Sequence, residues 1–406
     1  SSGESASNSF RLRLLPSKVI LYEGTLGKSR FWPLAGEEVR VADFSAFQET
    51  GEFVLEVDGK GTSYPFIIDK GVLKEALLGA IKGLYYQRMG IPLEEQFAGQ
   101  WQRRTAHPDE QLPFHASSGK NAGNMDSKGG WYDAGDYNKY VVNGAFSMGQ
   151  LFALYEQYPD QIKDGDLNIP ESGNQRSDFL DELKYEMDWL LTMQDEDGGV
   201  FHKVTTKNFE PMVMPNQATS QRYVVGKGTA ASLDFAACAA QASRIFVKED
   251  AQYATVCLKA AEAAWNWAQK HPEIPYRNPE DIRTGEYGDD NFEDERYWAA
   301  SELFTTTNKQ DYLTYLKNNP PSFSFNVGES WNGYMRFMGM YSLLSQDTLP
   351  QAMKDSLLLG LEATAQGIVE NISYNEYLQP IKTFKCGSNS DFLNAAKILA
   401  QVNRHL

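Results

Sequence analysis

The hydrophobic pattern of the chain changes near residue 70, and this change divides the molecule. Between Phe10 and about Asp69, apolar residues alternate with polar ones, which is the period of half-buried strands. After Gly71 the apolar residues recur with the period of an amphipathic helix. The 406 residues are also too many for one ordinary domain. We therefore expect a small antiparallel β module over 10–70 and a larger, mainly α domain over 71–406.

The second part is predicted to be almost entirely helical, with about ten helices and hardly any strand. Two connections, 90–140 and 196–228, are long and rich in Gly, Asn and Pro. Loops of such length in a compact domain usually carry function. The expected helices cover residues 73–84, 146–155, 180–194, 229–246, 253–269, 294–306, 312–316, 334–344, 349–371 and 391–402.

Two carboxylates three positions apart, Asp133 and Asp136, lie among glycines and aromatic residues at the end of the first long connection. Glycines allow a tight turn that no side chain obstructs. Flanking rings offer a wall for a flat ligand while the carboxylates point at one place. The pattern favours a site that activates water. A solvated acidic turn that caps the next helix is the alternative, because Asp is also a favoured cap and turn residue.

Charge and composition limit the class of partner. The net charge of −16, from 38 basic and 54 acidic residues, disfavours nucleic acid and anionic membranes and favours neutral substrates or cations. Aromatic residues form 13% of the chain, which suggests stacking surfaces for sugars or other planar groups. No apolar run approaches the roughly 20 residues that span a bilayer.

The cysteines Cys238, Cys257 and Cys386 predict neither a disulfide framework nor a cysteine metal site. Residues 1–9 have the composition of a polar tail or linker, with no visible signal peptide.

Residues 130–142, Gly-Trp-Tyr-Asp-Ala-Gly-Asp-Tyr-Asn-Lys-Tyr-Val-Val, resemble the signature of glycoside hydrolase family 9, the inverting β-1,4-glucanases. The N-terminal module, with Ser63-Tyr64-Pro65-Phe66-Ile67, is similar to the immunoglobulin-like domain in one branch of that family. The resemblance implies an immunoglobulin-like β-sandwich followed by an (α/α)6 barrel of twelve helices, of which about ten fall within this chain. Further segments that resemble the family, in the expected order, are 189–204, 229–244, 285–300 and 387–394.

By this resemblance, Asp136 is the general base and Asp133 holds and polarises the water. Two aspartates so close in sequence serve the same face of the sugar, because inversion separates base and acid by roughly 6.5–9.5 Å. The family's general acid, in a terminal Asn-Glu segment, and its His-His-Arg substrate segment would lie beyond Leu406. Asn375-Glu376 is expected to be a surface dipeptide. We therefore expect a C-terminally truncated catalytic domain, inactive or severely impaired as the 406-residue chain alone.

The resemblance places His202 at a glucose subsite, where it would exchange a hydrogen bond with a hydroxyl. Tyr132, Trp131 and Trp331 are candidate stacking rings for the substrate. For each of these residues the alternative is a buried structural role, since a lone histidine or tryptophan usually serves packing.

The resemblance also suggests calcium, which prefers hard oxygen ligands. The candidate ligands are Asp289, Asp290, Asp294 and Glu295. A solvated acidic loop that caps the following helix is the alternative. Some relatives with the N-terminal module hold a structural zinc through Cys and His. The matching positions here are Met89 and Ala106 beside His107, so we expect no zinc, and no organic cofactor is expected either.

The sequence as a whole predicts an endo-β-1,4-glucanase that acts on cellulose or a related β-glucan. By resemblance it is extracellular or periplasmic, and we expect a monomer. An exo-acting β-glucosidase or cellodextrinase is the enzymatic alternative, because the connection over 90–129 is long enough to wall off one end of a cleft. A non-catalytic glucan-binding protein is the alternative from another class.

Overall fold

The computed structural model separates into two compact units. One comprises Ser1–Leu78 with Gln366–Cys386, and the other comprises Gly79–Ala365 with Gly387–Leu406. Most of the expected polar tail, residues 1–7, lies outside the described residues. The structure describes residues 8–381, 383–384 and 387–405.

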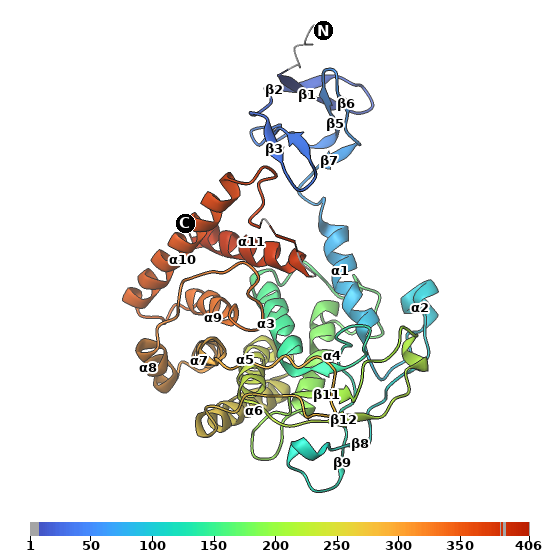
Figure 1. The fold of residues 1–406 in the computed structure, drawn as a ribbon, viewed down its shortest axis with the longest axis vertical. Helices are drawn as coiled ribbons and strands as arrows, with labels where there is room; N and C mark the ends of the chain where they lie inside the picture. Colours follow the sequence, from blue (N-terminus) through green and yellow to red (C-terminus); the bar gives the residue numbers. More distant parts are fainter. Residues whose placement is uncertain (1–7, 382, 385–386, 406) are drawn as a thin grey trace. The chain divides into compact units, whose positions relative to one another are not determined.

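The N-terminal unit is built on antiparallel strands, as the alternating pattern predicts. A sheet has the order β2-β1-β5-β6, with β7 also paired to β5, and β3 pairs with β4 (Figure 1). Phe10, Leu12 and Phe53 point to the buried side of this sheet and are fully buried. Alternate residues of one strand therefore form the core of the module. The strands are β1 (Ser9–Leu14), β2 (Ile20–Thr25), β3 (Arg30–Trp32), β4 (Glu37–Val39), β5 (Gly51–Val57), β6 (Gly61–Thr62) and β7 (Phe66–Ile68).

Helices dominate the rest of the described chain, and each of the ten predicted helices is confirmed. Their ends differ from the predicted ones by a few residues, and a short helix, α2, was not predicted. The helices are α1 (Lys74–Gln87), α2 (Glu95–Ala98), α3 (Val141–Gln157), α4 (Asp178–Thr192), α5 (Thr229–Phe246), α6 (Ala251–Lys270), α7 (Glu293–Thr307), α8 (Gln310–Asn318), α9 (Met335–Leu344), α10 (Gln351–Ser373) and α11 (Ser388–His405).

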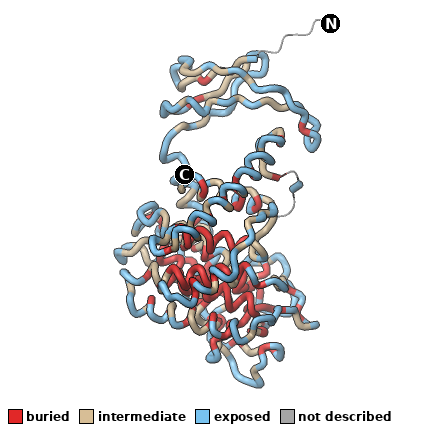
Figure 2. The backbone as a smooth tube through the Cα atoms, turned by 90° about the vertical axis from the view of Figure 1, so that its left-hand side faces the viewer, coloured by how far each residue is buried: buried red, intermediate tan, exposed pale blue. Residues whose placement is uncertain are grey.

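The helices of the second unit alternate between an inner and an outer layer. Helix α5 contacts α3 and α7, and α7 contacts α9, so α3, α5, α7 and α9 form the inner layer. The helices α4, α6 and α8 each contact the inner helix next to them in sequence. The burial of the residues agrees with this arrangement in layers. All ten residues of α9 and nearly all of α5 are buried (Figure 2). Helices that are apolar or small on every side belong inside a layered fold.

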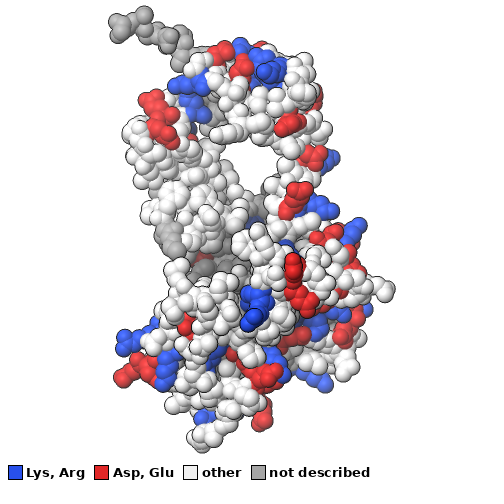
Figure 3. Space-filling view, turned by 90° about the vertical axis from the view of Figure 1, so that its right-hand side faces the viewer, with Lys and Arg blue, Asp and Glu red and all other residues white. Residues whose placement is uncertain are grey.

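The described part of the second unit has only a few short strands, which agrees with the expectation of hardly any strand there. The strands β10 (Lys139–Tyr140), β11 (Lys203–Thr206) and β12 (Arg222–Val224) form one antiparallel sheet, and β8 (Leu112–Pro113) pairs with β9 (Asn124–Met125). They lie in the two long connections and are too short for a periodic signal. None of the described helices is long and apolar enough to cross a membrane. Acidic and basic side chains are interspersed on the face that Figure 3 shows.

Candidate active site

The Asp133–Asp136 segment forms a closed turn directly before β10 and α3. The Asp133 amide donates to the Asn138 carbonyl at 3.0 Å, and the Tyr137 amide donates to the Ala134 carbonyl at 3.1 Å. Gly130, with φ +79°, brings the chain into this turn beside the Trp189 ring. A Cβ at Gly130 would lie 2.7 Å from Trp189 Cγ, so the glycine is required by space as well as by φ.

The Asp136 carboxylate is fixed by three donors. Tyr140 Oη donates to Oδ2 at 2.7 Å, and Asn138 Nδ2 donates to the same oxygen at 2.9 Å. The Asn138 amide donates to Oδ1 at 3.3 Å. Only 9% of Asp136 is exposed, so its orientation is set by the protein rather than by solvent.

Asp133 is the exposed member of the pair. Asn143 Nδ2 donates to its Oδ1 at 2.9 Å, and Tyr287 Oη donates to its Oδ2 at 3.4 Å. The surrounding protein displaces water from the carboxylate and raises the pKa of Asp133, and the negative charge of Asp136 raises it further. Asn143 and Tyr287 oppose this shift because they stabilise the charged form. Asp133 is therefore a stronger proton acceptor than a free aspartate.

A cavity of about 240 Å³ opens beside Asp133. Trp131 and Tyr132 line it, as predicted for substrate contact, but they are only 8% and 4% exposed. Their polar atoms are engaged, because Trp131 Nε1 donates to Glu182 at 2.8 Å and Tyr132 Oη bonds to His107 at 2.9 Å. Sugar stacking on these two rings stays a prediction. The lining residues are Leu84, Gln87, Trp131, Tyr132, Asp133, Tyr140, Asn143, Gly144, Ser147 and Glu186.

A series of aromatic rings connects Trp331 to the turn. The Trp331 ring meets the edge of Tyr287 with centroids 5.2 Å apart, and Tyr287 meets Tyr140 at 4.8 Å. Tyr287 and Tyr140 bind Asp133 and Asp136, respectively. The structure therefore brings Trp331 to the candidate site, across nearly 200 residues of sequence.

His202 lies in the interior of the second unit. It is 1% exposed, its Nε2 lies 2.8 Å from the Glu286 carbonyl, and its ring stacks on Tyr276 at 3.8 Å. Burial lowers the pKa of His202 to about 3, so the ring is neutral. His202 Nε2 fixes the loop that leads to Tyr287, while its Nδ1 has no hydrogen-bond partner among the described residues, so its contact with a sugar hydroxyl stays a prediction.

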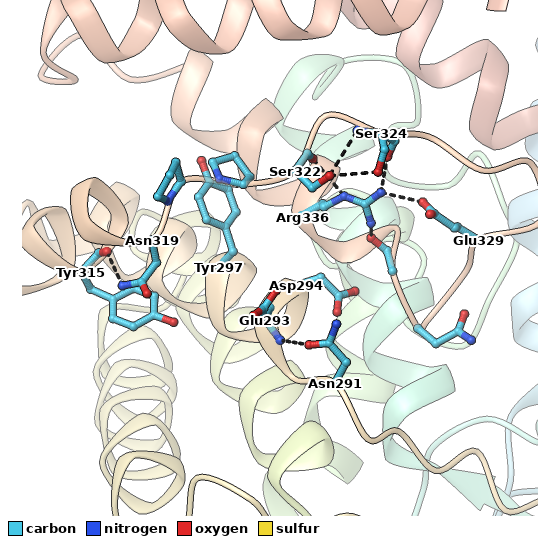
Figure 4. Close-up of a pocket in the computed structure, with 14 residues that line it drawn as sticks. Asn291, Glu293, Asp294, Tyr297, Tyr315, Asn319, Ser322, Ser324, Glu329 and Arg336 are labelled. Carbon is cyan, nitrogen blue, oxygen red and sulfur yellow. Dashed lines mark hydrogen bonds and ion pairs between the residues drawn. The ribbon is translucent and has the colours of Figure 1, made fainter.

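The four candidate calcium ligands differ in exposure: Asp290 is exposed, Asp289 is intermediate, and two carboxylates in the first turn of α7 are buried, Asp294 and Glu295. Asp290 forms an ion pair with Arg277 at the surface, and its place among the metal ligands stays a prediction. Asp289, Asp294 and Glu295 each have a buried oxygen without a hydrogen-bond partner. Burial raises the pKa of all three, that of Asp294 to about 6. Asp294 also lines a second cavity, of about 410 Å³, where Arg336 binds Ser322, Ser324 and Glu329 (Figure 4).

The fit of these carboxylates to calcium is incomplete. Their unpartnered oxygens have the chemistry that Ca²⁺ prefers. Within residues 8–381, 383–384 and 387–405, however, no three His, Cys, Asp or Glu side chains are arranged to hold a metal ion. Calcium at this loop therefore stays a prediction. At the positions considered for zinc, Met89 is buried and both ring nitrogens of His107 are engaged, with Tyr132 and the Ala218 carbonyl.

Several residues that hold the turn were not predicted. Glu186 accepts from the Trp131 amide at 2.6 Å, and Glu182 pairs with the buried Arg88 at 3.0 Å. Asn143 and Tyr287 bind Asp133 directly. These residues lie 10 to 154 positions away from their partners in the sequence, so no local sequence pattern predicts their contacts with the turn. Only Asn138 and Tyr140 fall inside the motif.

Comparison with known proteins places the chain in a family. The model of glycosyl hydrolase family 9 matches residues 74–405, and that of the cellulase N-terminal Ig-like domain matches residues 1–62. A xyloglucan-specific endo-β-1,4-glucanase of Bacteroides ovatus is 46% identical over 285 residues, covering 66% of this chain and 48% of that protein. Endoglucanase D of Acetivibrio thermocellus is 36% identical over 397 residues, covering 95% of this chain and 62% of that protein.

A solved family 9 structure from Bacteroides ovatus superposes with a TM-score of 0.86 at 35% identity, covering 99% of this chain and 79% of that one. The chain spans about half to three fifths of the length of the two curated relatives. The alternation of inner and outer helices agrees with the (α/α)6 barrel expected from the sequence, and the strand-rich N-terminal unit agrees with the expected immunoglobulin-like domain. The chain belongs to glycosyl hydrolase family 9.

Proposed function

We propose that this protein is an endo-β-1,4-glucanase that hydrolyses a glucan chain with inversion. One observation carries the proposal: Asp133 and Asp136 lie on a single rigid turn beside an open cavity, bound to aromatic and amide side chains. Asp133 lines the cavity and Asp136 lies three residues away on the same turn, an arrangement that suits the activation of one water molecule. The name of the Bacteroides ovatus relative, a xyloglucan-specific endo-β-1,4-glucanase, supports a β-1,4-glucan as substrate.

The two aspartates have different proposed roles. Asp136 is the general base, because three donors aim its carboxylate in one direction. Asp133 holds the water from the cavity side, where it remains exposed and its pKa is raised. The base takes a proton as the water attacks the anomeric carbon, and the glycosidic bond breaks on the opposite face. An acid outside this turn supplies the proton to the leaving oxygen.

The substrate is proposed to be a neutral polymer. A chain with a net charge of −16 repels anionic polymers over a long range. Tyr287 and Trp331 extend an aromatic wall from the turn, which suits the flat faces of glucose rings. A polymer too large for uptake implies that the enzyme works outside the cytoplasm, and we propose that location for it.

The test measures hydrolysis by the protein as its gene encodes it, on the neutral substrates xyloglucan, hydroxyethyl cellulose and cellohexaose. An endo-acting enzyme lowers the viscosity of the polymers before many reducing ends appear, and proton NMR shows the α-anomer of the new reducing end first. Asp136→Asn serves as the catalytic control. Viscosity that falls only in proportion to reducing ends would support exo action, and binding of cellohexaose without any product would support the glucan-binding alternative. An initial β-anomer would contradict inversion.

A further inference from the structure

A buried cluster of one carboxylate and two cations lies behind the catalytic turn, and the proposed chemistry does not use it. Its members are Asp109, Lys139 and Arg222, each no more than 5% exposed. Lys139 Nζ lies 3.1 Å from Asp109 Oδ2, and Arg222 Nε donates to Asp109 Oδ1 at 3.0 Å. Burying a charged group costs free energy unless the group is paired. Three buried charged side chains in contact therefore indicate a structural or functional role.

Each cation also donates to main-chain carbonyls in or next to the turn, and Arg222 Nη2 donates to Met89 Sδ. Lys139 Nζ donates to the Ser127 carbonyl at 2.6 Å and to the Gly129 carbonyl at 3.0 Å. The contact with Asp109 is an ion pair, so the hydrogen bonds of the ammonium group go to these two carbonyls. Arg222 Nη1 donates to the Tyr137 carbonyl at 2.5 Å. The contacts therefore lie on both sides of Asp133 and Asp136 along the chain.

The backbone at these points is in conformations that need support. Gly129, Gly130 and Tyr137 all have positive φ, and for the tyrosine, at +58°, this conformation is strained. Asp109 also has a positive φ, +49°, and its carbonyl accepts from the Ser127 amide at 2.9 Å. The cluster thus ties together segments that have little regular structure of their own.

We infer that Asp109, Lys139 and Arg222 are positioning residues that hold the main chain of the Gly129–Tyr140 turn so that Asp133 and Asp136 face the same water. Asp109 serves as the shared counter-ion that keeps both cations in place. The inference rests on the proposed function of the turn, since it assigns the cluster to the geometry of the two aspartates.

The test uses two variants and a matched control. Arg222→Lys keeps the positive charge but loses the fork that reaches both Asp109 and Tyr137. Asp109→Asn keeps the shape but removes the negative charge. Arg244→Lys is the control, because Arg244 is another enclosed arginine that pairs with Glu156 and Glu302 and contacts no residue of the turn. If Asp109→Asn fails to fold, Arg222→Lys carries the test alone.

Amide hydrogen exchange of a peptide that covers residues 129–140 reports on the turn without any need for catalysis. We expect exchange there to be at least tenfold faster in Arg222→Lys and Asp109→Asn, and unchanged in Arg244→Lys. The same two substitutions are then made in the protein as its gene encodes it, and kcat on a soluble glucan is measured. We expect kcat to fall by ~10²-fold in each variant while KM changes less than about threefold, because a displacement of about 1 Å costs that much in rate.

Wild-type exchange rates in both cluster variants would overturn the inference, and so would a loss of kcat matched by Arg244→Lys. Absence of hydrolysis by the wild-type protein is a different result. It refutes the proposed function and with it the catalytic part of the inference, whereas the exchange data still decide whether the cluster holds the turn.

Discussion

Replacement of Gly130 by alanine tests whether the turn is as tightly packed as the structure shows. The added Cβ would lie 2.7 Å from Trp189 Cγ. Trp189 has little freedom to move, since it is 1% exposed and its Nε1 donates to Ser127 at 3.0 Å. Gly119 offers a matched control, because its φ of +75° is nearly the same as the +79° of Gly130 while nothing lies within 4 Å of its Cβ position.

The magnitude has two parts. An alanine at positive φ costs about 1–2 kcal/mol at either site. Overpacking adds about 1–3 kcal/mol at Gly130 alone. Replacing glycine by alanine also lowers the conformational entropy of the unfolded chain. This effect is the same in both variants, so it cancels when their free energies of unfolding are compared. We therefore expect Gly130→Ala to lower the free energy of unfolding by about 1–3 kcal/mol more than Gly119→Ala.

The assay is thermal unfolding followed by near-ultraviolet circular dichroism, together with activity below the transition. At roughly 2 °C per kcal/mol for a domain of this size, the two Tm values should differ by about 2–6 °C. Gly130→Ala should also lose activity well below its Tm, because the clash displaces the turn. Equal Tm values for the two variants would refute the reasoning, since they would show that Trp189 moves aside without cost.

Further predictions concern single groups of the site. Asp136→Asn should reduce kcat by about 10²–10⁴-fold and by more than Asp133→Asn, and equal losses would contradict the proposed roles. Burial raises the pKa of Glu186 to about 8, so the folded state holds a proton that the unfolded chain releases above about pH 4.3. Stability from this group is complete below that pH and is lost as the pH rises through 8. The Tm should then fall from pH 5 to 8 less steeply in Glu186→Gln, and parallel curves would contradict this. Tyr287→Phe removes a donor to Asp133, so the pKa of Asp133 should rise and the acid limb of the pH–rate profile should move to higher pH; an unmoved limb argues against the bond. A chelator should lower the Tm and calcium should restore it, with no such response in Asp294→Asn; a wild-type Tm indifferent to both would end the calcium prediction.

The sequence predicts the fold well where the signal is periodic. The helix over 229–246 is found at those residues, because its small and apolar residues are continuous and Gly228 precedes it. Short elements escaped prediction for the opposite reason. The strands β10 and β11 have only two and four residues, and their pairing depends on chain segments more than 60 positions apart.

The site was predicted only as far as its local motif. Asp133 and Asp136 could be named from their spacing, but their unequal exposure depends on Asn143 and Tyr287, which fold back from elsewhere. His202 was placed at a glucose subsite by the family resemblance, and this stays a prediction. Its stacking on the Tyr276 ring, 74 positions later, could not be predicted from the sequence. Contacts between residues so far apart in the chain produce no local pattern from which a single sequence could predict them.

The packing of the inner helix α5 limits which substitutions the protein can accept. Its residues from Thr229 to Ser243 are all buried, mostly beside other helices, and most of them are small. Almost any larger side chain there would need simultaneous changes in several neighbours. Libraries for thermostable variants should therefore leave α5 constant and draw their diversity from the solvent side of α6 and α8, where a substitution alters one contact at a time.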